Sequence, residues 1–393
     1  MLRGTNQEFG RPYNRRIVLE TIRLGAPITR AAIAKRVGLT VQTVSTIVRE
    51  LELQGFLIAR RGRSVGRGSP AVSLAINPEG GFAIGVHLTP LGIEAALINL
   101  AGEVVGHDRR ALPHSTPEAA FREIEVLAKR LAGLRPAGRM LGVGMAMPGP
   151  FDVESMSFVG PTTMEGWKGV PIRERLAMAT GLPAFIEVDL AAAAHGERLY
   201  GAGRDFREFY YLYFGVGLGG CMVHDGATLR GAWGNAGEIG HLPVVPDGDP
   251  CPCGNRGCLE RYVSREAYER QTPTIGVEAW LAASAPLFRS AIVTIENLFD
   301  PETIIIGGLT PKSFLMRLIE AATPLPNSVA ARGHRSAPRL VLSEAGPETV
   351  LRGAAALAVS GNLSPRFGQM FARDPGRLER DPIMTGGGQA RAA

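Results

Sequence analysis

The chain has 393 residues, of which 45% are hydrophobic and 20% are charged, so it can build cores and lacks the composition of a disordered or coiled-coil protein. Its net charge of +6 is uneven, because residues 1–78 carry 13 Lys or Arg, 4 Glu and no Asp, whereas the remainder carries 30 basic and 33 acidic residues. No apolar run reaches the ~18 residues of a membrane span and the first residues lack the apolar segment of a signal peptide, so we expect a cytoplasmic protein that does not bind membranes.

The basic first fifth of the chain begins with three short segments of helical periodicity. Thr29 and Thr40 are suitable N-caps for the second and third segments, and glycines and a proline separate the three. A basic, glycine-rich stretch then lies between two predicted strands. The helices are expected at 14–24, 29–38 and 40–53, and the strands at 56–59 and 71–76. This order predicts a winged helix-turn-helix domain over residues 1–78.

The third predicted helix carries short polar side chains and one arginine on the face opposite its apolar residues. Such side chains suit an element that enters the major groove of DNA. The wing, which we define as residues 60–70, alternates arginine with glycine and suits phosphates or a narrow minor groove. The expected DNA-binding residues are Gln42, Thr43, Ser45, Thr46 and Arg49 of the helix and Arg61, Arg63 and Arg67 of the wing. The alternative is a protein-interaction module with a solvated basic loop.

After a linker at 77–81, the pattern becomes that of an α/β body. A unit of three strands, a helix, a strand and a helix occurs twice, although its copies share no visible sequence identity. The first copy is expected to have strands at 82–88, 93–100, 104–111, 140–147 and 184–188, with helices at 117–132, 171–180 and 190–200. The second is expected to have strands at 210–214, 221–224, 303–306 and 339–342 and a long helix at 277–299. We predict lobes at 79–200 and 201–362 and a disordered tail at 363–393.

Three of the four cysteines lie within eight residues of one another. In a reducing compartment, such a cluster favours a metal site over disulfides. Gly237-Glu238-Ile239-Gly240-His241 precedes the cluster and adds one imidazole, which gives the Cys₃His donor set of a closed structural zinc site. We therefore predict Zn²⁺ bound by His241, Cys251, Cys253 and Cys258. Free surface thiols on a loop are the alternative.

Glu238 and Glu260 flank the predicted zinc ligands without being needed as ligands themselves. Two carboxylates held by a rigid loop can accept hydrogen bonds from a ligand with many hydroxyl groups. The alternative role is support of the zinc ligands.

Taken together, these motifs resemble the signature of the ROK family (repressors, open reading frames and kinases), including the helix-turn-helix of its xylose and N-acetylglucosamine repressors. The resemblance covers about residues 10 to 360. Further matching segments are 142–150, 166–171, Asp189 with 196–197, 297–302 and 306–308. The resemblance implies an actin-like, ribonuclease-H-type, two-lobed sugar-kinase-like body with a sugar site in the cleft between its lobes. It also implies zinc at the same four residues.

The kinases of this family need an acidic residue on the first strand and glycines near the ATP phosphates. Here His87 stands in place of that Asp and the adjacent glycines are missing. The second phosphate loop, at 215–220, survives in part, with Val216 where the kinases usually have Thr. Phosphoryl transfer depends on positioning and charge neutralisation, so we expect no kinase activity. Asp189, which matches the catalytic base, is then a vestige of that base.

The sugar site implied by the resemblance is expected to include Asp189, Glu238, His241, Glu260 and Gly149. It departs from the family pattern at Val188, which replaces an Asn that would bind ring hydroxyls. Three carboxylates favour a neutral sugar over a sugar acid or phosphate. The apolar Val188 favours a pentose or deoxy sugar over glucose.

We interpret the chain as a sugar-responsive transcription regulator, a repressor of carbohydrate genes. It would bind operator DNA as a homodimer or a higher homo-oligomer, because helix-turn-helix proteins read palindromes as two-fold assemblies. The first alternative is an active ROK-type sugar kinase with an accessory DNA-binding head. The second is a constitutive DNA-binding protein with a vestigial sugar fold.

Overall fold

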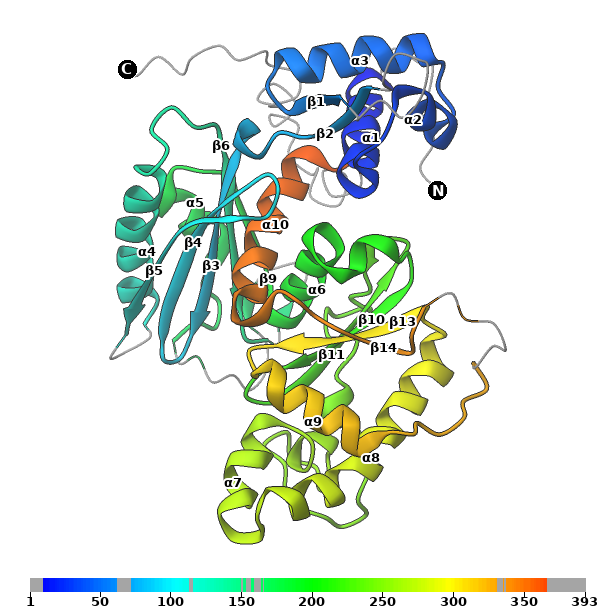
Figure 1. Ribbon diagram of the computed structural model, residues 1–393. Helices are drawn as coiled ribbons and strands as arrows, with labels where there is room; N and C mark the ends of the chain where they lie inside the picture. The colour runs from blue at the N-terminus through cyan, green and yellow to red at the C-terminus, as the bar shows by residue number, and fades with distance from the viewer. Residues whose placement is uncertain are drawn as a thin grey trace. The chain divides into compact units, whose positions relative to one another are not determined.

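The chain forms two compact units in a computed structural model that describes residues 10–61, 72–112, 116–149, 151–152, 157–158, 164, 166–330, 335 and 337–365 (Figure 1). Unit 1 comprises Met1–Met145, Ile172–Ile186 and Ala354–Ala393, and unit 2 comprises Ala146–Pro171 and Glu187–Gly353. The lobe limits expected from sequence stay a prediction, and most of the expected tail, 366–393, lies outside the described residues. None of the described helices is both long and apolar enough to cross a membrane.

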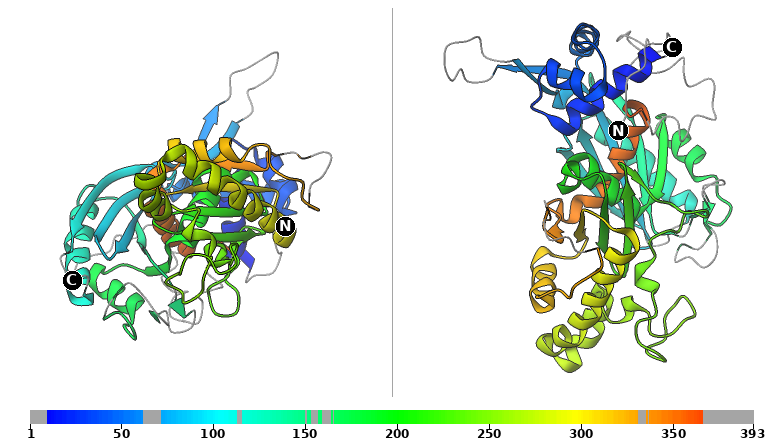
Figure 2. Two further views of the ribbon diagram at one scale, coloured as in Figure 1. Left: turned by 90° about the horizontal axis from the view of Figure 1, so that it is seen from below. Right: turned by 90° about the vertical axis from the view of Figure 1, so that its right-hand side faces the viewer.

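A winged helix-turn-helix begins unit 1, as the sequence predicts. Its elements are α1 (Gly10–Gly25), α2 (Arg30–Val37), α3 (Val41–Leu53), β1 (Leu57–Arg61) and β2 (Val72–Ile76). Thr29 caps α2 by accepting a hydrogen bond from the Ala32 amide at 3.3 Å, and Thr40 caps α3 in the same way from Thr43 at 3.1 Å. Gly38 adopts the left-handed conformation (φ 69°) that the tight turn between α2 and α3 requires. Figure 2 shows β1 and β2 as a two-stranded antiparallel ribbon beside the helices.

The linker expected at 77–81 is a packed turn in the structure. Its short 3₁₀ helix, η1 (Pro78–Gly80), follows Asn77, whose side-chain amide donates to the Gly55 carbonyl at 2.8 Å. A Cβ atom at Gly80 would lie 2.5 Å from the same carbonyl oxygen, so this position excludes any larger residue. The backbone therefore passes from the helix-turn-helix into the first sheet through a packed turn and not through a solvated spacer.

Three arginines attach the helix-turn-helix to the rest of unit 1, and one of them, Arg16 of α1, donates to the Asn362 carbonyl at 3.3 Å. Arg139, which precedes β6, donates to the Gln54 carbonyl at 3.0 Å, and its guanidinium carbon lies 4.4 Å from the centre of the Phe56 ring. Arg23 of α1 donates to the Leu100 carbonyl at 3.2 Å and is itself buried. These contacts join the helix-turn-helix to the first sheet and to Asn362 within unit 1.

Each unit is built around a five-stranded sheet, and the two sheets have the same strand order. The first has the order β5-β4-β3-β6-β9 and the second the order β12-β11-β10-β13-β14. The strands of the first are β3 (Phe82–Thr89), β4 (Gly92–Asn99), β5 (Val104–Ala111), β6 (Met140–Met147) and β9 (Ala184–Val188). Those of the second are β10 (Phe209–Phe214), β11 (Leu218–His224), β12 (Ala227–Thr228), β13 (Thr303–Gly308) and β14 (Leu340–Leu342). The repetition predicted from sequence is confirmed.

Helices cover both sheets (Figure 1). They are α4 (Pro117–Ala132), α5 (Ile172–Thr180), α6 (Asp189–Tyr200), α7 (Arg265–Ile275), α8 (Val277–Phe299), α9 (Lys312–Ala322) and α10 (Thr349–Leu363). The sequence analysis did not include α7, α9, α10, β12 or the short hairpin of β7 (Phe151–Asp152) and β8 (Ser157–Phe158). In unit 2, α8 packs Trp280 and Phe288 against Tyr210 and Phe214 of β10, and all four are buried.

Glu296 of α8 is fully buried in unit 2 and is paired with two arginines. Its carboxylate accepts hydrogen bonds from Arg339 at 2.7 and 2.8 Å and from Arg335 at 3.1 Å. Burial alone would raise the pKa of Glu296, but the hydrogen bonds from Arg339 and Arg335 and the positive charge of Arg339 lower it below its usual value. The carboxylate is thus ionised and ties α8 to the segment that leads into β14.

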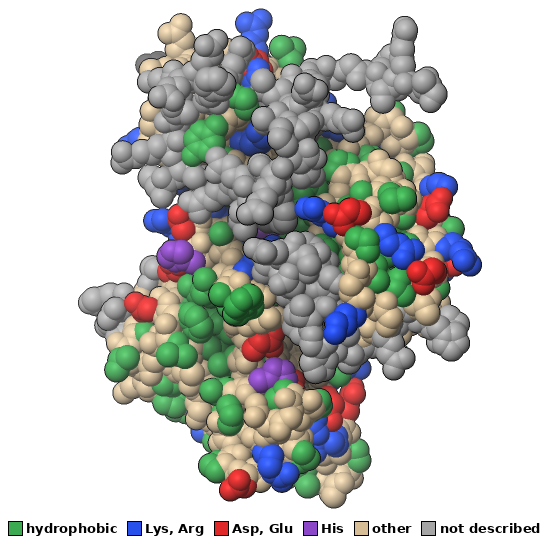
Figure 3. All heavy atoms as spheres, turned by 180° about the vertical axis from the view of Figure 1, so that it is seen from behind, with side chains coloured by type: hydrophobic (Ala, Val, Ile, Leu, Met, Phe, Trp, Pro, Cys, Tyr) green, Lys and Arg blue, Asp and Glu red, His purple; other side chains and the backbone are tan. Residues whose placement is uncertain are grey.

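Acidic and basic side chains lie next to one another on the face drawn in Figure 3. The ion pairs on the surface of unit 1 include Arg175 with Glu118 at 3.0 Å and Lys129 with Glu125 at 2.6 Å. Such exposed pairs contribute little to stability.

Candidate ligand and metal site

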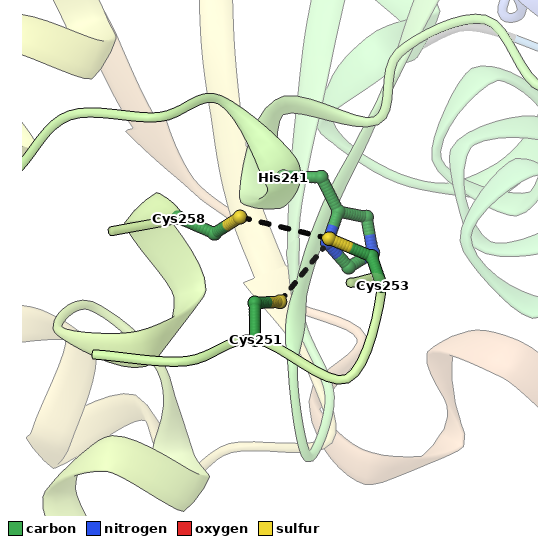
Figure 4. A group of neighbouring side chains, drawn as sticks. All are labelled: His241, Cys251, Cys253 and Cys258. Carbon is green, nitrogen blue, oxygen red and sulfur yellow. Dashed lines mark hydrogen bonds between the residues drawn. The ribbon is translucent and has the colours of Figure 1, made fainter. Parts of the chain in front are cut away.

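Four sulfur and nitrogen donors converge in unit 2, as Figure 4 shows. The donor atoms of His241, Cys251, Cys253 and Cys258 all lie within 4.8 Å of one another. The short helix η3 (Ile239–His241) presents the imidazole, and Cys258 caps a second one, η4 (Leu259–Arg261). Bridges between Pro243 and Cys258 and between Pro250 and Arg256 fold the loop back on itself. All four residues expected from sequence therefore meet at one point.

The spacing of these donors fits a tetrahedral zinc ion. With Zn–S near 2.3 Å and Zn–N near 2.0–2.1 Å, tetrahedral geometry places two sulfurs about 3.7 Å apart and a sulfur and a nitrogen about 3.6 Å apart. Here the sulfurs of Cys253 and Cys258 are 3.7 Å apart, and the Cys251 sulfur is 3.6 Å from Nδ1 of His241. Burial raises the pKa values of the Cys251 and Cys258 thiols, whereas the Asn255 amide lowers the pKa of the Cys253 thiol to about 7, so Cys253 forms a thiolate most readily of the three.

Glu260 lies directly beside this cluster. One of its oxygens is 3.3 Å from the Cys251 sulfur and 3.5 Å from Nδ1 of His241. The turn between β10 and β11 approaches from the other side, and a Cβ atom at Gly217 would lie 2.8 Å from the second oxygen of Glu260. Glu238 is 4.0 Å from Nε2 of His241. Both carboxylates thus lie beside the His/Cys cluster, and their role in binding a ligand stays a prediction.

Asp189 stands at the first position of α6. Its Oδ1 accepts a hydrogen bond from the Leu190 amide at 2.8 Å. Burial raises the pKa of Asp189 to about 6, the Leu190 amide lowers it, and the negative charge of Glu238 raises it further. The Glu238 carboxylate is thus near enough for its charge to act on Asp189. Their grouping with Glu260 into one sugar site, together with His241 and with Gly149 at the end of β6, stays a prediction.

The raised pKa of Asp189 makes a prediction about stability and pH. The pKa of Asp189 is near 4 in the unfolded chain and about 6 in the folded protein. The carboxyl therefore begins to destabilise the folded state as the pH rises above about 4, and this destabilisation is complete above about pH 6. Asp189→Asn keeps the shape and the acceptor for the Leu190 amide but removes the charge. We expect the difference in unfolding free energy between the variant and wild type to grow by roughly 1 kcal/mol, in favour of the variant, from pH 5 to pH 7.5. Urea unfolding at both pH values measures this, and an unchanged difference would contradict it.

A buried ion pair that the sequence analysis missed lies two residues before Asp189. Glu187 of β9 is buried and pairs with Arg230, which follows β12. The Val188 amide also donates to Glu187, at 3.1 Å. No sequence signal joins Glu187 to an arginine 43 positions away, so only the fold reveals the pair.

The polar face of α3 is accessible. Gln42, Thr46 and Arg49 are exposed, and Thr43 and Ser45 are partly buried. The Thr43 and Thr46 hydroxyls already make hydrogen bonds within the domain, to Thr40 at 2.8 Å and to the Gln42 carbonyl at 3.2 Å. The wing residues Arg63 and Arg67 and the side chain of Arg61 lie outside the described residues. DNA contact by all of these residues stays a prediction.

His87 lies on β3 in unit 1 and is 5% exposed. Its Nε2 is buried and has no hydrogen-bond partner among the described residues. Burial lowers the pKa of His87 to about 4, so the imidazole is neutral at physiological pH. A neutral imidazole cannot supply the negative charge that a carboxylate would at this position.

Comparison with known proteins places these features in a family. A ROK family model matches residues 83–360, and a model for winged helix-turn-helix DNA-binding matches residues 12–58. A xylose repressor from Caldicellulosiruptor bescii is 30% identical over 345 residues, which cover 77% of this chain and 84% of that protein.

Solved structures give the same result. The crystal structure of a ROK family transcriptional regulator, a homologue of the E. coli MLC protein, superposes with a TM-score of 0.71 at 25% identity and covers 91% of this chain and 98% of the other. A ROK family glucokinase from Streptomyces griseus, solved with glucose and AMPPNP, gives 0.58 at 26% identity and covers 72% and 100%.

Proposed function

The chain belongs to the ROK family and is a DNA-binding transcription regulator that resembles the family's xylose repressors, and from this premise we propose that it represses carbohydrate genes and releases its operator when it binds a neutral sugar. The observation that carries the proposal is the pair of carboxylates beside the His/Cys cluster, Glu238 and Glu260, to which we add Asp189. Asp189, Glu238 and Glu260 offer acceptors for hydroxyl groups. The ionised forms would repel a sugar acid or phosphate, which favours a neutral sugar, and the apolar Val188 favours a pentose such as xylose or a deoxy sugar.

Zinc is the proposed cofactor of this site. His241, Cys251, Cys253 and Cys258 would hold it in a closed set of four protein ligands, which leaves no open position for a reaction. The ion would cross-link the loop that carries Glu260 to the short helix that follows Glu238. Its role is thus to fix the two carboxylates.

Replacing Glu260 by glutamine tests the sugar site. We expect Glu260→Gln to bind the operator as wild type does but to need at least about tenfold more D-xylose for release, because a charged acceptor is lost from the site. Fluorescence anisotropy with an operator selected by the wild-type protein measures both quantities. Glu269→Gln, an exposed carboxylate of α7, is the matched control. Unchanged release by Glu260→Gln would place the effector site elsewhere.

A second candidate function is sugar phosphorylation. It is favoured by the similarity to glucokinases and by Asp189, which matches the family's catalytic base. Against it stands the neutral, buried His87 on β3. Sugar-dependent ATP turnover in an assay with xylose and glucose would establish the kinase, and its absence would leave the regulator.

Arg49 is the one cation on the exposed polar face of α3, so we propose that it contacts base edges in the operator. A good bidentate contact contributes about 1–3 kcal/mol to discrimination. Arg49→Ala should therefore weaken operator binding by roughly 5- to 150-fold and leave binding to random DNA nearly unchanged. The control is Arg173→Ala, an exposed arginine of α5. Equal losses on operator and random DNA would reassign Arg49 to phosphate contact.

We also propose that the protein acts as a homodimer or a larger homo-oligomer, because a two-fold operator requires two DNA-binding domains. Light scattering at micromolar concentration, with and without operator, tests the assembly. A monomer under both conditions would contradict it.

A further inference from the structure

We propose that Trp233 forms an aromatic wall of the sugar site and stacks against the aliphatic C–H face of a bound sugar ring. This inference rests on the proposed function and assigns a further specificity-determining residue to the same site. Trp233 is 77% exposed, which is unusual for so large an apolar side chain. Among the described residues, no aromatic ring stacks on it.

The loop that carries Trp233 leaves the edge of the second sheet and is closed by hydrogen bonds of its own. It spans 231–235, and the Ala236 amide closes it by donating to the Arg230 carbonyl at 3.1 Å. Gly231 (φ 72°) and Gly234 (φ 86°) supply the left-handed turns on either side of the indole. The Asn235 side chain donates to the Trp233 carbonyl at 3.2 Å. The backbone is therefore shaped to present Trp233 outward.

Both ends of the loop are fixed to residues that neighbour the candidate site. At the first end, Arg230 pairs with buried Glu187, two residues before Asp189. At the other end, Gly237 packs against the Gly220 carbonyl and accepts a hydrogen bond from the Tyr210 hydroxyl at 3.1 Å. Glu238 is the next residue after Gly237 in the chain. Asp189 and Glu238 thus lie within two residues, along the chain, of the groups that anchor the two ends of the loop.

An indole beside several carboxylates indicates which kind of ligand the site would bind. Carboxylates accept hydrogen bonds from hydroxyl groups at the edge of a sugar ring, but they give nothing to its aliphatic face. An exposed indole offers a large, stiff apolar surface at a low entropy cost. A ligand with hydroxyls on its edge and C–H groups on its face satisfies both parts, and a neutral pyranose has this form. A small polar acid or a phosphate ester satisfies neither.

Tryptophan fluorescence makes the contact directly visible. The chain has three tryptophans, and the other two, Trp167 and Trp280, are fully buried. Stacking a sugar on Trp233 removes water from the exposed indole, so the wild-type emission should shift to shorter wavelength as D-xylose is added. Trp233→Phe should abolish the shift while calorimetry still gives a dissociation constant within about threefold of wild type, because the phenyl ring retains most of the stacking surface.

Removing the ring altogether gives the decisive variant. Trp233→Ala should raise the dissociation constant for D-xylose at least about tenfold and leave zinc content, thermal unfolding and operator binding unchanged. Leu298→Ala, which removes a side chain that is 70% exposed on α8, is the control and should bind as wild type does. A Trp233→Ala protein with wild-type affinity overturns the inference alone. A wild-type protein that binds none of a panel of neutral sugars overturns the inference and the proposed function together.

A binding partner other than a sugar would give a different experimental result. If Trp233 were the contact for a second copy of the chain, Trp233→Ala would lower the molar mass in light scattering and leave sugar affinity intact. That result also overturns the assignment to sugar.

Discussion

Cys258→Ser should reduce the zinc content of the purified protein from about one ion per chain to nearly none. Cys258 is fully buried, and its neighbour Leu259 donates a backbone hydrogen bond to Leu242 at 2.9 Å, so the ligand joins two segments of the loop. A structural zinc contributes about 10 kcal/mol or more of apparent binding energy in small zinc-binding peptides. Unit 2 has its own hydrophobic core and should stay folded, with a melting temperature lower by several degrees.

The loss of zinc should also abolish the response to the sugar, because Glu260 lies two residues after Cys258. We expect operator binding to persist and D-xylose to lose its effect. Metal analysis and operator release measure the two consequences. Cys221→Ser is the control, because Cys221 is buried in β11 outside the cluster and should retain zinc. A Cys258→Ser protein with a full complement of zinc would refute the assignment of this ligand.

The second large effect concerns Glu296. Removing one partner of a buried ion pair costs about 3–5 kcal/mol, because the remaining charges stay buried without compensation. Glu296→Ala leaves Arg335 and Arg339, whose side chains are 18% and 21% exposed, without their carboxylate. We expect that loss of unfolding free energy in urea, and a smaller loss for Glu296→Gln, which keeps one acceptor.

Glu320→Ala is the matched control for this experiment. Glu320 is an exposed carboxylate on α9 and should change the free energy of unfolding by no more than about 0.5 kcal/mol. If Glu296→Ala is as mild as Glu320→Ala, the three-residue cluster contributes little and the segment before β14 is held by its backbone contacts.

Elements with a clear amphipathic period and recognisable ends were predictable from sequence. The predicted ranges of α4 and α8 agree with the structure, because an apolar stripe of 3.6-residue period ends at a cap or a helix-breaking residue in each. In contrast, α10 was missed because its residues from Ala354 to Val359 are buried all round, which leaves no polar face to mark the period. No such reason covers α9, whose amphipathic pattern was readable.

Some residues of the candidate site were likewise predictable from sequence and others were not. The zinc donors were predictable because three cysteines and a histidine at short spacing have few other uses. Glu187 with Arg230 and the exposure of Trp233 were not predictable, since both depend on how distant segments pack. The wing arginines were predicted from composition alone and remain outside the described residues.

The attachment of the helix-turn-helix to unit 1 has a consequence for engineering. A chimeric regulator is commonly made by exchanging DNA-binding heads at a presumed linker, which the sequence would put at 77–81. Here that junction is a packed turn, and Arg139 on the recipient side binds Gln54 and the Phe56 ring on the donor side. A transplanted head that lacks an aromatic residue at position 56 would leave the Arg139 guanidinium without its stacking partner. The graft should therefore keep Phe56 and Asn77, or Arg139 should be substituted together with the head.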